Sequence, residues 1–584
     1  MQNTSARLIS AFTLIATCTF GQKAWVAPAN FGLAPSEAAI NPSITLSDLS
    51  PANLAVNMGA WDWVTDDKVV VVNWIWNPPA APSGDIWMME GLKTQDKTKI
   101  TLKKYYNGTL REPLGVKVVN GDVYVAIKYA LVKMVDANKD GMAESVEQIV
   151  EIPHKEDSYS YNHYQEDLKY KDGFFYIALG AETRGAGYPG YPVMETRGSV
   201  VKIDLAKKTQ DFLVRGLRTP DGLGWGPDGE LFVTDNQGAW LPSSKLIHVV
   251  KGRFYGLQPI ETGDPSLVES PPAVWMPHGE ASSSPTQPMM LEKGPFAGQF
   301  LVGDNIHGVV NRIALEKVNG EYQGVLFHFT GGVYCAVHRL LQNDAGDVYF
   351  GGLGSPINTW NYKDRYYGMQ LAKFNGKSNF EVKEILSKAD GFTLHFNAPV
   401  GPSAEDAANY RLRQWRYVPT KEYGGPKIDN VALTLGAITV DPTRTYVNIK
   451  VNGLLKGRVV DFQFHKDLMS QASQPIWTSE AWYTLNQIST DASQFPVGIN
   501  ASDAEGAANR IKVSKFSNRY VLDVSGGYFT EVSIMHLDGR MAWQGQVEKY
   551  GSIVLSQNDI RPGIYILALK GRQGLISSRR IVFN

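Results

Sequence analysis

The sharpest pattern with chemical meaning is an acidic loop at residues 136–147. In a calcium loop of this length, oxygen ligands occupy positions one, three, five and twelve, and a glycine at position six permits the sharp turn. The chain has matching residues at those positions: Asp136, Asn138, Asp140, Gly141 and Glu147. The flanking residues have strand patterns, whereas an EF-hand would need helices. We therefore predict a structural Ca²⁺ site inside a β-sheet, with a metal-free Asp/Asn turn as the alternative.

A second set of residues combines a histidine with a downstream arginine. His163 precedes the alternating run 173–180, and Arg218 opens the phrase Arg-Thr-Pro-Asp-Gly-Leu that ends at Leu223. A histidine suits abstraction of a hydroxyl proton, and an arginine suits stabilisation of developing negative charge. A hydrogen-bonded histidine at a strand end and an inter-blade salt bridge of Arg218 are the alternatives without chemistry.

These phrases, with those at 226–235 and 251–256, resemble the soluble quinoprotein glucose and sorbosone dehydrogenases over residues 60–375. That family consists of six-bladed β-propellers that bind pyrroloquinoline quinone (PQQ) on one face. The resemblance implies that His163 is the base and that Arg218 stabilises charge while a sugar or polyol hydroxyl or an aldehyde is oxidised. It also implies that the cofactor lies among Asp221, Asp235, Asn236, His338 and Arg339.

The chain is closer still to a less characterised branch of that family, which consists of large secreted proteins named as membrane-bound-type dehydrogenases. The marks of this branch are the phrases at 235–240, 274–278 and 480–486. No Cys-x-x-Cys-His haem attachment occurs in the sequence. The resemblance therefore implies a separate electron acceptor.

Two features depart from the pattern of the family. Asp221 stands where an amide usually contacts the quinone, and a carboxylate there repels a tricarboxylate cofactor. Near the last blade the family carries arginines, where this chain has Ala336, His338 and Arg339. A non-catalytic carbohydrate-binding or adhesion propeller is therefore the second hypothesis. In either case exposed aromatic residues such as Trp240 and Trp360 would stack on sugar rings.

The elements that must position these residues are short strands separated by Asp-Gly or Asn-Gly turns. Turns of this kind recur at 120–121, 172–173 and 228–229, and each introduces an alternating strand. A repeated turn-and-strand unit is typical of propeller blades. We predict an all-β fold in which residues 45–380 form a six-bladed propeller.

Beyond the predicted propeller the strand pattern continues without the Asp-Gly phrase. We predict an Ig-like β-sandwich at 381–489, a linker at 490–508 and a small C-terminal β-sandwich at 509–584. The last unit carries Leu-Asp-Gly-Arg at 537–540 and Pro-Gly-Ile-Tyr at 562–565, followed by a basic strand. It resembles the sorting domain of proteins exported by the type IX secretion machinery, with an ordinary terminal sandwich as the alternative.

The N-terminus and the composition indicate where the protein is located and which kinds of partner it binds. Residues 1–24 have signal-peptide proportions, which predicts a secreted or cell-surface protein. No later segment reaches the length of an apolar membrane span. The 57 basic and 58 acidic residues give a net charge of −1, which supplies no bulk attraction to nucleic acid. We expect a carbohydrate or polyol as the ligand.

Overall fold

The computed structural model describes residues 39–75, 83–153, 165–181, 196–258, 264, 266–354 and 362–492, with the strands and a few neighbouring residues between 512 and 583. The predicted signal peptide and most of the predicted linker lie outside the described residues. Within the described part, no helix is long and apolar enough to cross a membrane.

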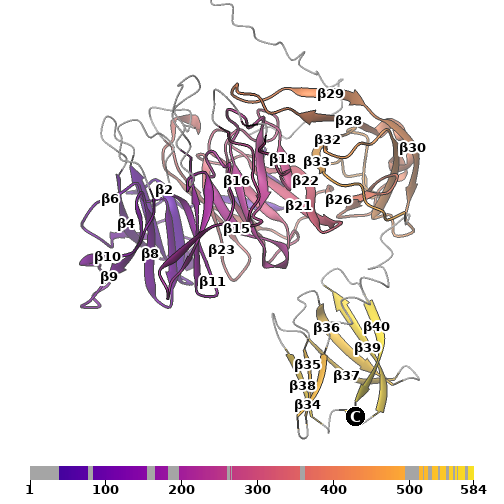
Figure 1. Ribbon diagram of the computed structural model, residues 1–584. Coiled ribbons are helices and arrows are strands. Elements are labelled where there is room, and N and C mark those ends of the chain that lie inside the picture. The colour runs from indigo at the N-terminus through magenta and orange to yellow at the C-terminus, as the bar shows by residue number, and fades with distance from the viewer. Residues whose placement is uncertain are drawn as a thin grey trace, which may run out of the picture.

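Six sets of four antiparallel strands follow one another along the first part of the chain, and the fifth set belongs to a larger eight-stranded sheet (Figure 1). The first contains β2 (Met58–Thr65), β3 (Lys68–Ile75), β4 (Ser83–Glu90) and β5 (Thr101–Lys104), with β6 (Leu110–Arg111) beside β4. The second contains β7 (Gly115–Val119), β8 (Asp122–Ile127), β9 (Ala130–Val135) and β10 (Ser145–Glu151). The third contains β11 (Gln165–Lys171), β12 (Phe174–Leu179), β13 (Ser199–Asp204) and β14 (Thr209–Phe212).

The remaining three sheets complete the ring. The fourth contains β15 (Gly222–Trp225), β16 (Leu231–Asp235), β17 (Ser244–His248) and β18 (Val274–Met276). The fifth begins with β19 (Pro285–Met290), β20 (Phe300–Asp304), β21 (Val310–Val318) and β22 (Glu321–Thr330). The sixth contains β23 (Val337–Gln342), β24 (Val348–Gly352), β25 (Met369–Phe374) and β1 (Ile44–Asp48).

The six sheets are the blades of a propeller. The innermost strands β2, β7, β11, β15, β19 and β23 contact one another in ring order, and β23 returns to β2. The ring is closed by β1, an early segment that pairs with β25 and supplies the outer strand of the sixth blade. The predicted all-β class and propeller architecture are confirmed.

Turn chemistry explains why the blades form where they do. Asn120 and Gly121 both adopt positive φ between β7 and β8, and Asp172 and Gly173 do so between β11 and β12. Two-residue hairpins of this kind need left-handed φ at both positions, which Asn, Asp and Gly accept most readily. Helical structure among the described residues is restricted to short 3₁₀ segments: Leu92–Thr94, Pro227–Gly229, Tyr362–Asp364, Pro402–Glu405 and Ala407–Asn409.

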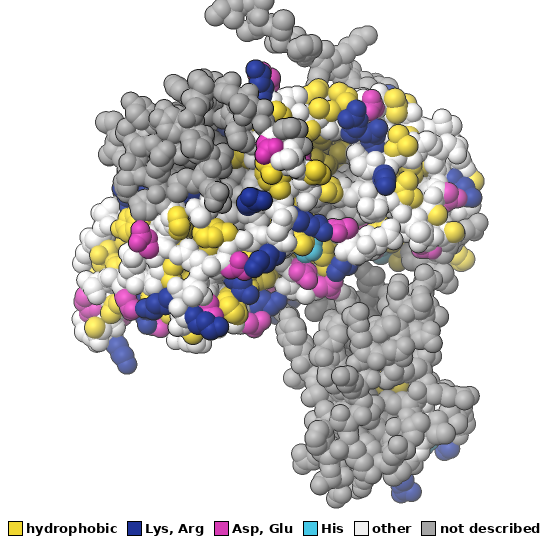
Figure 2. All heavy atoms as spheres, viewed as in Figure 1, with side chains coloured by type: hydrophobic (Ala, Val, Ile, Leu, Met, Phe, Trp, Pro, Cys, Tyr) yellow, Lys and Arg dark blue, Asp and Glu magenta, His cyan; other side chains and the backbone are white. Residues whose placement is uncertain are grey.

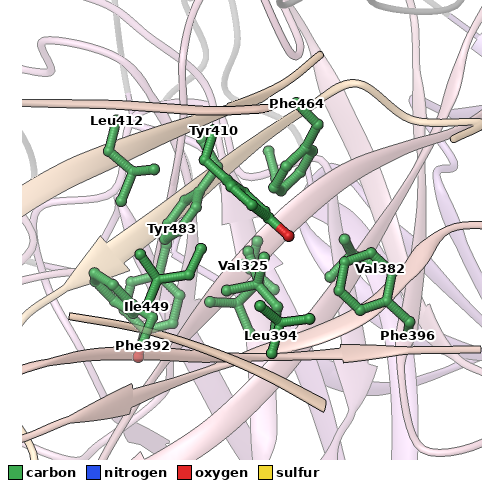
Figure 3. Close-up of a cluster of buried hydrophobic side chains, with 14 of the residues drawn as sticks. Val325, Val382, Phe392, Leu394, Phe396, Tyr410, Leu412, Ile449, Phe464 and Tyr483 are labelled. Atoms are coloured by element: carbon green, nitrogen blue, oxygen red, sulfur yellow. The ribbon is translucent and has the colours of Figure 1, made fainter. Parts of the chain in front are cut away.

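Two further sheets follow the propeller. One contains β26 (Val382–Lys388), β27 (Gly391–Phe396), β31 (Tyr446–Asn452) and β30 (Thr434–Val440). The other contains β33 (Glu480–Leu485), β32 (Arg458–Phe464), β28 (Tyr410–Tyr417) and β29 (Lys427–Ala432). Side chains of both sheets form one hydrophobic core (Figure 3).

The fifth blade and this sandwich share one sheet. β22 pairs with β33, so that eight strands run continuously from the propeller into the sandwich. Val325 of β22 lies within the sandwich core beside Phe392 and Leu394 (Figure 3). The pairing covers what would otherwise be an exposed outer strand edge, which is a site of aggregation. The sequence pattern shows two successive units and not this join.

The C-terminal part contains two smaller antiparallel sheets. One is formed by β34 (Lys512–Phe516), β35 (Arg519–Asp523) and β38 (Ser552–Ser556). The other is formed by β37 (Met541–Gln546), β36 (Phe529–Met535), β39 (Gly563–Gly571) and β40 (Ile576–Phe583). Val532, Ile534, Leu555 and Leu567 are buried, so this part has apolar residues of its own to pack.

Candidate functional site

The starts of the innermost strands and the ends of the second strands meet on one face of the propeller. In the fourth blade Gly222 pairs with Thr234, and in the fifth blade Pro285 pairs with Asp304. Because these strands are antiparallel, the residue before the first strand lies beside the residue after the second. We call this the upper face; it includes Asp221, Asn236, Ser284, Asn305 and His338.

Asp235 and Asp304 each fix the loop that enters their own blade. The carboxylate of Asp235 accepts hydrogen bonds from the backbone N–H groups of Arg218 (3.0 Å) and Thr219 (2.9 Å). The carboxylate of Asp304 does the same for its blade, with the backbone N–H groups of Ser283, Ser284, Ile306 and His307. Both aspartates are fully buried, and burial raises the pKa of Asp235 to about 6. Asp235 therefore shapes the Arg218 loop.

Asp221 is surrounded by amide and hydroxyl groups. Its Oδ2 lies 3.2 Å from Asn236 Nδ2, 3.5 Å from Ser284 Oγ and 3.5 Å from Asn305 Nδ2. Asn305 also lies 3.2 Å from Nδ1 of His338, whose pKa is lowered by burial. Burial raises the pKa of Asp221 to about 7. The structure thus brings three of the predicted cofactor residues into one buried polar cluster, which the repeated Asp-Asn pairs at 235–236 and 304–305 build.

Arg339 crosses the axis of the propeller. Its Nη1 donates to the backbone oxygen of Asp221 at 2.7 Å, and its Nη2 donates to that of Leu114 at 3.3 Å. The carboxylate of Glu166 lies 3.8 Å away, but burial still raises the pKa of Glu166 well above its ordinary value. Arg339 is only 1 % exposed and joins four blades at once. Its guanidinium is committed to the scaffold.

Among the described residues predicted for catalysis or cofactor binding, Arg218 is the one that stays partly exposed. Its guanidinium lies 5.2 Å from the ring centre of Tyr423, and its Nη1 donates to Thr219 Oγ1 at 3.3 Å. A Cβ at Gly238 would come within 2.1 Å of Arg218 Cδ, so only glycine leaves room for this side chain. Tyr423 is itself 52 % exposed. Arginine over a tyrosine face is a favourable cation–π arrangement.

The loop between β28 and β29 brings Tyr423 to the propeller. Trp240 N donates to the oxygen of Thr420 at 2.7 Å, and Gly424 N donates to the oxygen of Gly238 at 3.0 Å. Figure 1 shows the β28–β29 hairpin reaching from the sandwich over the propeller. We call residues 418–426 the roof loop. Trp240 is held at φ 63°, a left-handed conformation that bulky residues rarely adopt.

Figure 2 shows one face of the molecule with side chains coloured by type, and basic and acidic side chains are interspersed over its described surface. This mixture agrees with the near-zero net charge of the sequence. A surface without a dominant sign of charge does not select a strongly charged partner. The chemistry of the candidate site therefore depends on its own residues rather than on a field of the whole protein.

Several predicted residues lie elsewhere or outside the described part. His163 and Trp360 are outside the described residues; His163 comes two positions before Gln165, the first residue of β11 on the upper face. The sequence interpretation missed Glu166, Ser284, Asn305 and Tyr423. Of these only Asn305 had a signal, because its Asp-Asn pair repeats the pair at 235–236.

The acidic loop of the second blade brings three carboxylates together. Ligand oxygens of Asp136, Asp140 and Glu144 all lie within 4.8 Å of one another. Asn138 bonds Asp140 through its side chain at 3.1 Å. Glu147 is exposed on β10 opposite Lys133 and is not part of this group. β10 begins at Ser145, before the twelfth position of the predicted loop is reached. The third carboxylate of the group is therefore Glu144, at position nine, and not the predicted Glu147 at position twelve.

Solved structures similar to this chain cover rather more than half of it. No family model and no curated protein matches the chain. A glucose dehydrogenase from Thermus thermophilus matches at 15 % identity and a TM-score of 0.40, over 56 % of this chain and 99 % of that one. The PQQ-bound aldose sugar dehydrogenase of Streptomyces coelicolor matches at 13 % identity and 0.40, over 57 % and 99 %. The apo form of the soluble aldose sugar dehydrogenase of Escherichia coli matches at 12 % and 0.37, over 57 % and 100 %. We take no function from likeness at this level.

Proposed function

We propose that the protein is an exported carbohydrate-binding propeller whose ligand site lies around Arg218 and Tyr423 on the upper face. The observation that carries the proposal is the half-exposed Tyr423 ring stacked beside a partly exposed guanidinium. An aromatic ring packs against the C–H face of a sugar, and an arginine donates several hydrogen bonds to its hydroxyls. Few polar groups beside an apolar wall are typical of small-ligand sites.

The described residues do not suit PQQ. The carboxyl group of Asp221 would lie beside a cofactor that itself carries three carboxylates, and like charges repel. The guanidinium of Arg339 is already committed to two backbone oxygens and is 1 % exposed. We therefore derive no chemical step through the quinone. Quinone-dependent oxidation with His163 as the base is the alternative function, and the test below distinguishes it from binding alone.

The binding test compares Tyr423→Ala with Leu455→Ala in the full chain. Isothermal titration with glucose, sorbitol and cellobiose should detect binding to the parent. Binding should be about fivefold weaker in Tyr423→Ala, because a stacking ring contributes on the order of 1 kcal/mol. Leu455 is equally exposed, at 51 %, on another part of the sandwich and serves as the control. Equal affinity of both variants would remove Tyr423 from the site. Dye reduction by the parent with PQQ and Ca²⁺ would favour the dehydrogenase instead.

For the second blade we propose that residues 136–144 bind Ca²⁺ and hold the loop in place. Three carboxylates within 4.8 Å repel one another unless a cation or protons intervene. Asp140→Asn should lower the melting temperature by a few degrees in Ca²⁺, because a saturating ligand stabilises the folded state by about 2–3 kcal/mol. Chelation of the parent should produce the same change, and Asp390→Asn, at an exposed ion pair, is the control. A chelator-insensitive melting temperature would exclude the site.

For export we propose that residues 509–584 act as a type IX sorting domain. The described strands of this part form two small sheets with buried apolar residues, as a separately folding unit requires. Deletion of residues 505–584 in a host with type IX secretion should leave a folded protein in the periplasm. Cell fractionation and immunoblotting measure this, and release of the truncated protein into the medium would disprove the role.

A further inference from the structure

Arg218 is a partly exposed arginine without a carboxylate partner among the residues that the structure describes. Within that part of the chain its guanidinium makes one hydrogen bond, from Nη1 to Thr219 Oγ1 at 3.3 Å, and lies over the ring of Tyr423. By contrast Arg253, which is also partly exposed, donates two hydrogen bonds of 2.6 and 2.8 Å to the carboxylate of Glu321. A guanidinium has five N–H donors, so most of those of Arg218 remain available to a ligand.

The charged groups near Arg218 do not take the place of that partner. The carboxylate of Asp235 accepts hydrogen bonds from the backbone N–H groups of Arg218 and Thr219 and from none of the guanidinium donors. Its attraction to the Arg218 side chain is therefore through space, without a hydrogen bond. In the roof loop Lys421 and Glu422 are both exposed and of opposite sign, so together they add no net charge.

The Arg218 side chain is held between the propeller and the roof loop. A Cβ at Gly238 would come within 2.1 Å of Cδ and 2.3 Å of Nε of Arg218, so the side chain lies directly against this stretch of backbone. Gly238 also accepts a hydrogen bond from the backbone N–H of Gly424, the residue after Tyr423. A side chain that is fixed before binding loses less conformational freedom when a ligand arrives. Arg218 is therefore prepared to bind one group in a defined position.

We propose that the ligand at Arg218 and Tyr423 is an acidic sugar, a uronic acid alone or within a polysaccharide, whose carboxylate pairs with the guanidinium. This inference rests on the proposed carbohydrate site and narrows its ligand class. A carboxylate accepts two parallel N–H bonds from an arginine, and such charge-assisted bonds are roughly twice as strong as neutral ones. A sugar hydroxyl supplies no opposite charge. The C–H face of the sugar ring packs against the half-exposed ring of Tyr423.

The test compares ligands that differ in the charged group. Full-length protein is titrated calorimetrically at pH 7, without added calcium, with galacturonic acid, its methyl ester and galactose. Glucuronic acid, its methyl ester and glucose form a second series. In at least one series the acid should bind about tenfold or more tightly than both neutral sugars, as a hydrogen bond to a charged group provides.

Variants then assign the preference to the guanidinium. Arg218→Gln should lower the affinity for the acid to that for its ester. Arg218→Lys should keep part of the preference, because an ammonium retains the charge and loses the planar fork. Arg416→Gln removes an exposed arginine that pairs with Asp429 on the sandwich, and as the control it should leave the preference unchanged. Circular dichroism establishes that each variant is folded.

The outcomes separate this inference from the proposed function. Equal binding of acid, ester and neutral sugar in both series, weakened throughout by Tyr423→Ala, would overturn the acidic ligand and leave the carbohydrate site in place. A preference for the acid that survives Arg218→Gln would overturn the role of Arg218. If none of the sugars binds, the inference and the proposed function both fail. If Arg218→Gln does not fold, the comparison of acid with ester in the parent still decides whether the ligand is acidic.

Discussion

Replacing Arg339 with methionine is expected to lower the free energy of unfolding by about 3–5 kcal/mol. The guanidinium holds backbone oxygens before β7 and β15 and balances Glu166, while its own strand belongs to the sixth blade. Methionine fills a similar volume but removes the guanidinium donor from the Asp221 oxygen and the cation from beside Glu166, while the Leu114 oxygen keeps only the Asp167 N–H at 3.3 Å. Denaturant unfolding followed by tryptophan fluorescence measures the loss.

A matched substitution separates this effect from the loss of any arginine. Arg416 forms an exposed ion pair with Asp429, and both side chains are more than 40 % accessible. Arg416→Met should change the stability by no more than about 0.5 kcal/mol, since exposed ion pairs contribute little. Similar losses in the two variants would show that Arg339 does not organise the axis.

Local patterns in the sequence predicted the class of fold because they depend on neighbouring residues. Asn120-Gly121 and Asp172-Gly173 turn where the sequence indicates, since their side chains and φ preferences act over a few residues. The join between β22 and β33 could not be predicted in this way, because the two strands are about 150 residues apart. Edge-to-edge pairing leaves no mark in the alternation of either strand.

The sequence predicted which residues gather at the candidate site better than it predicted how their side chains are arranged. Asp221, Asn236 and His338 do gather, since loops that enter successive blades open on one face. The direction of an individual side chain was not predicted. Arg339 follows His338 in β23, and successive side chains of a strand point to opposite sides, so Arg339 points across the axis and His338 does not. Tyr423 arrives from the sandwich, and nothing in its local sequence indicates a propeller contact.

The join between the fifth blade and the sandwich should be sensitive to pH through Glu316. The Tyr483 hydroxyl donates to Glu316 Oε1, and Ser387 N donates to the same oxygen at 2.7 Å. Burial raises the pKa of Glu316 from 4.5 to about 7. Between these values the folded protein holds a proton that the unfolded chain has released. The contribution of Glu316 to stability therefore falls as the pH rises from about 4.5 to 7, by up to roughly 3 kcal/mol.

Glu316→Gln keeps the shape of this side chain but cannot ionise. Other buried acids with raised pKa values, such as Asp221 and Glu480, titrate in both proteins. Their contributions therefore cancel when the unfolding free energy of the variant is compared with that of the parent. Unfolding measured at pH 5 and pH 8 should show the variant gaining stability relative to the parent as the pH rises. A constant difference between the two proteins would mean that Glu316 ionises at its ordinary pKa. The shared sheet would then tolerate a charge at the join, and its strand pairing alone would hold the propeller and sandwich together.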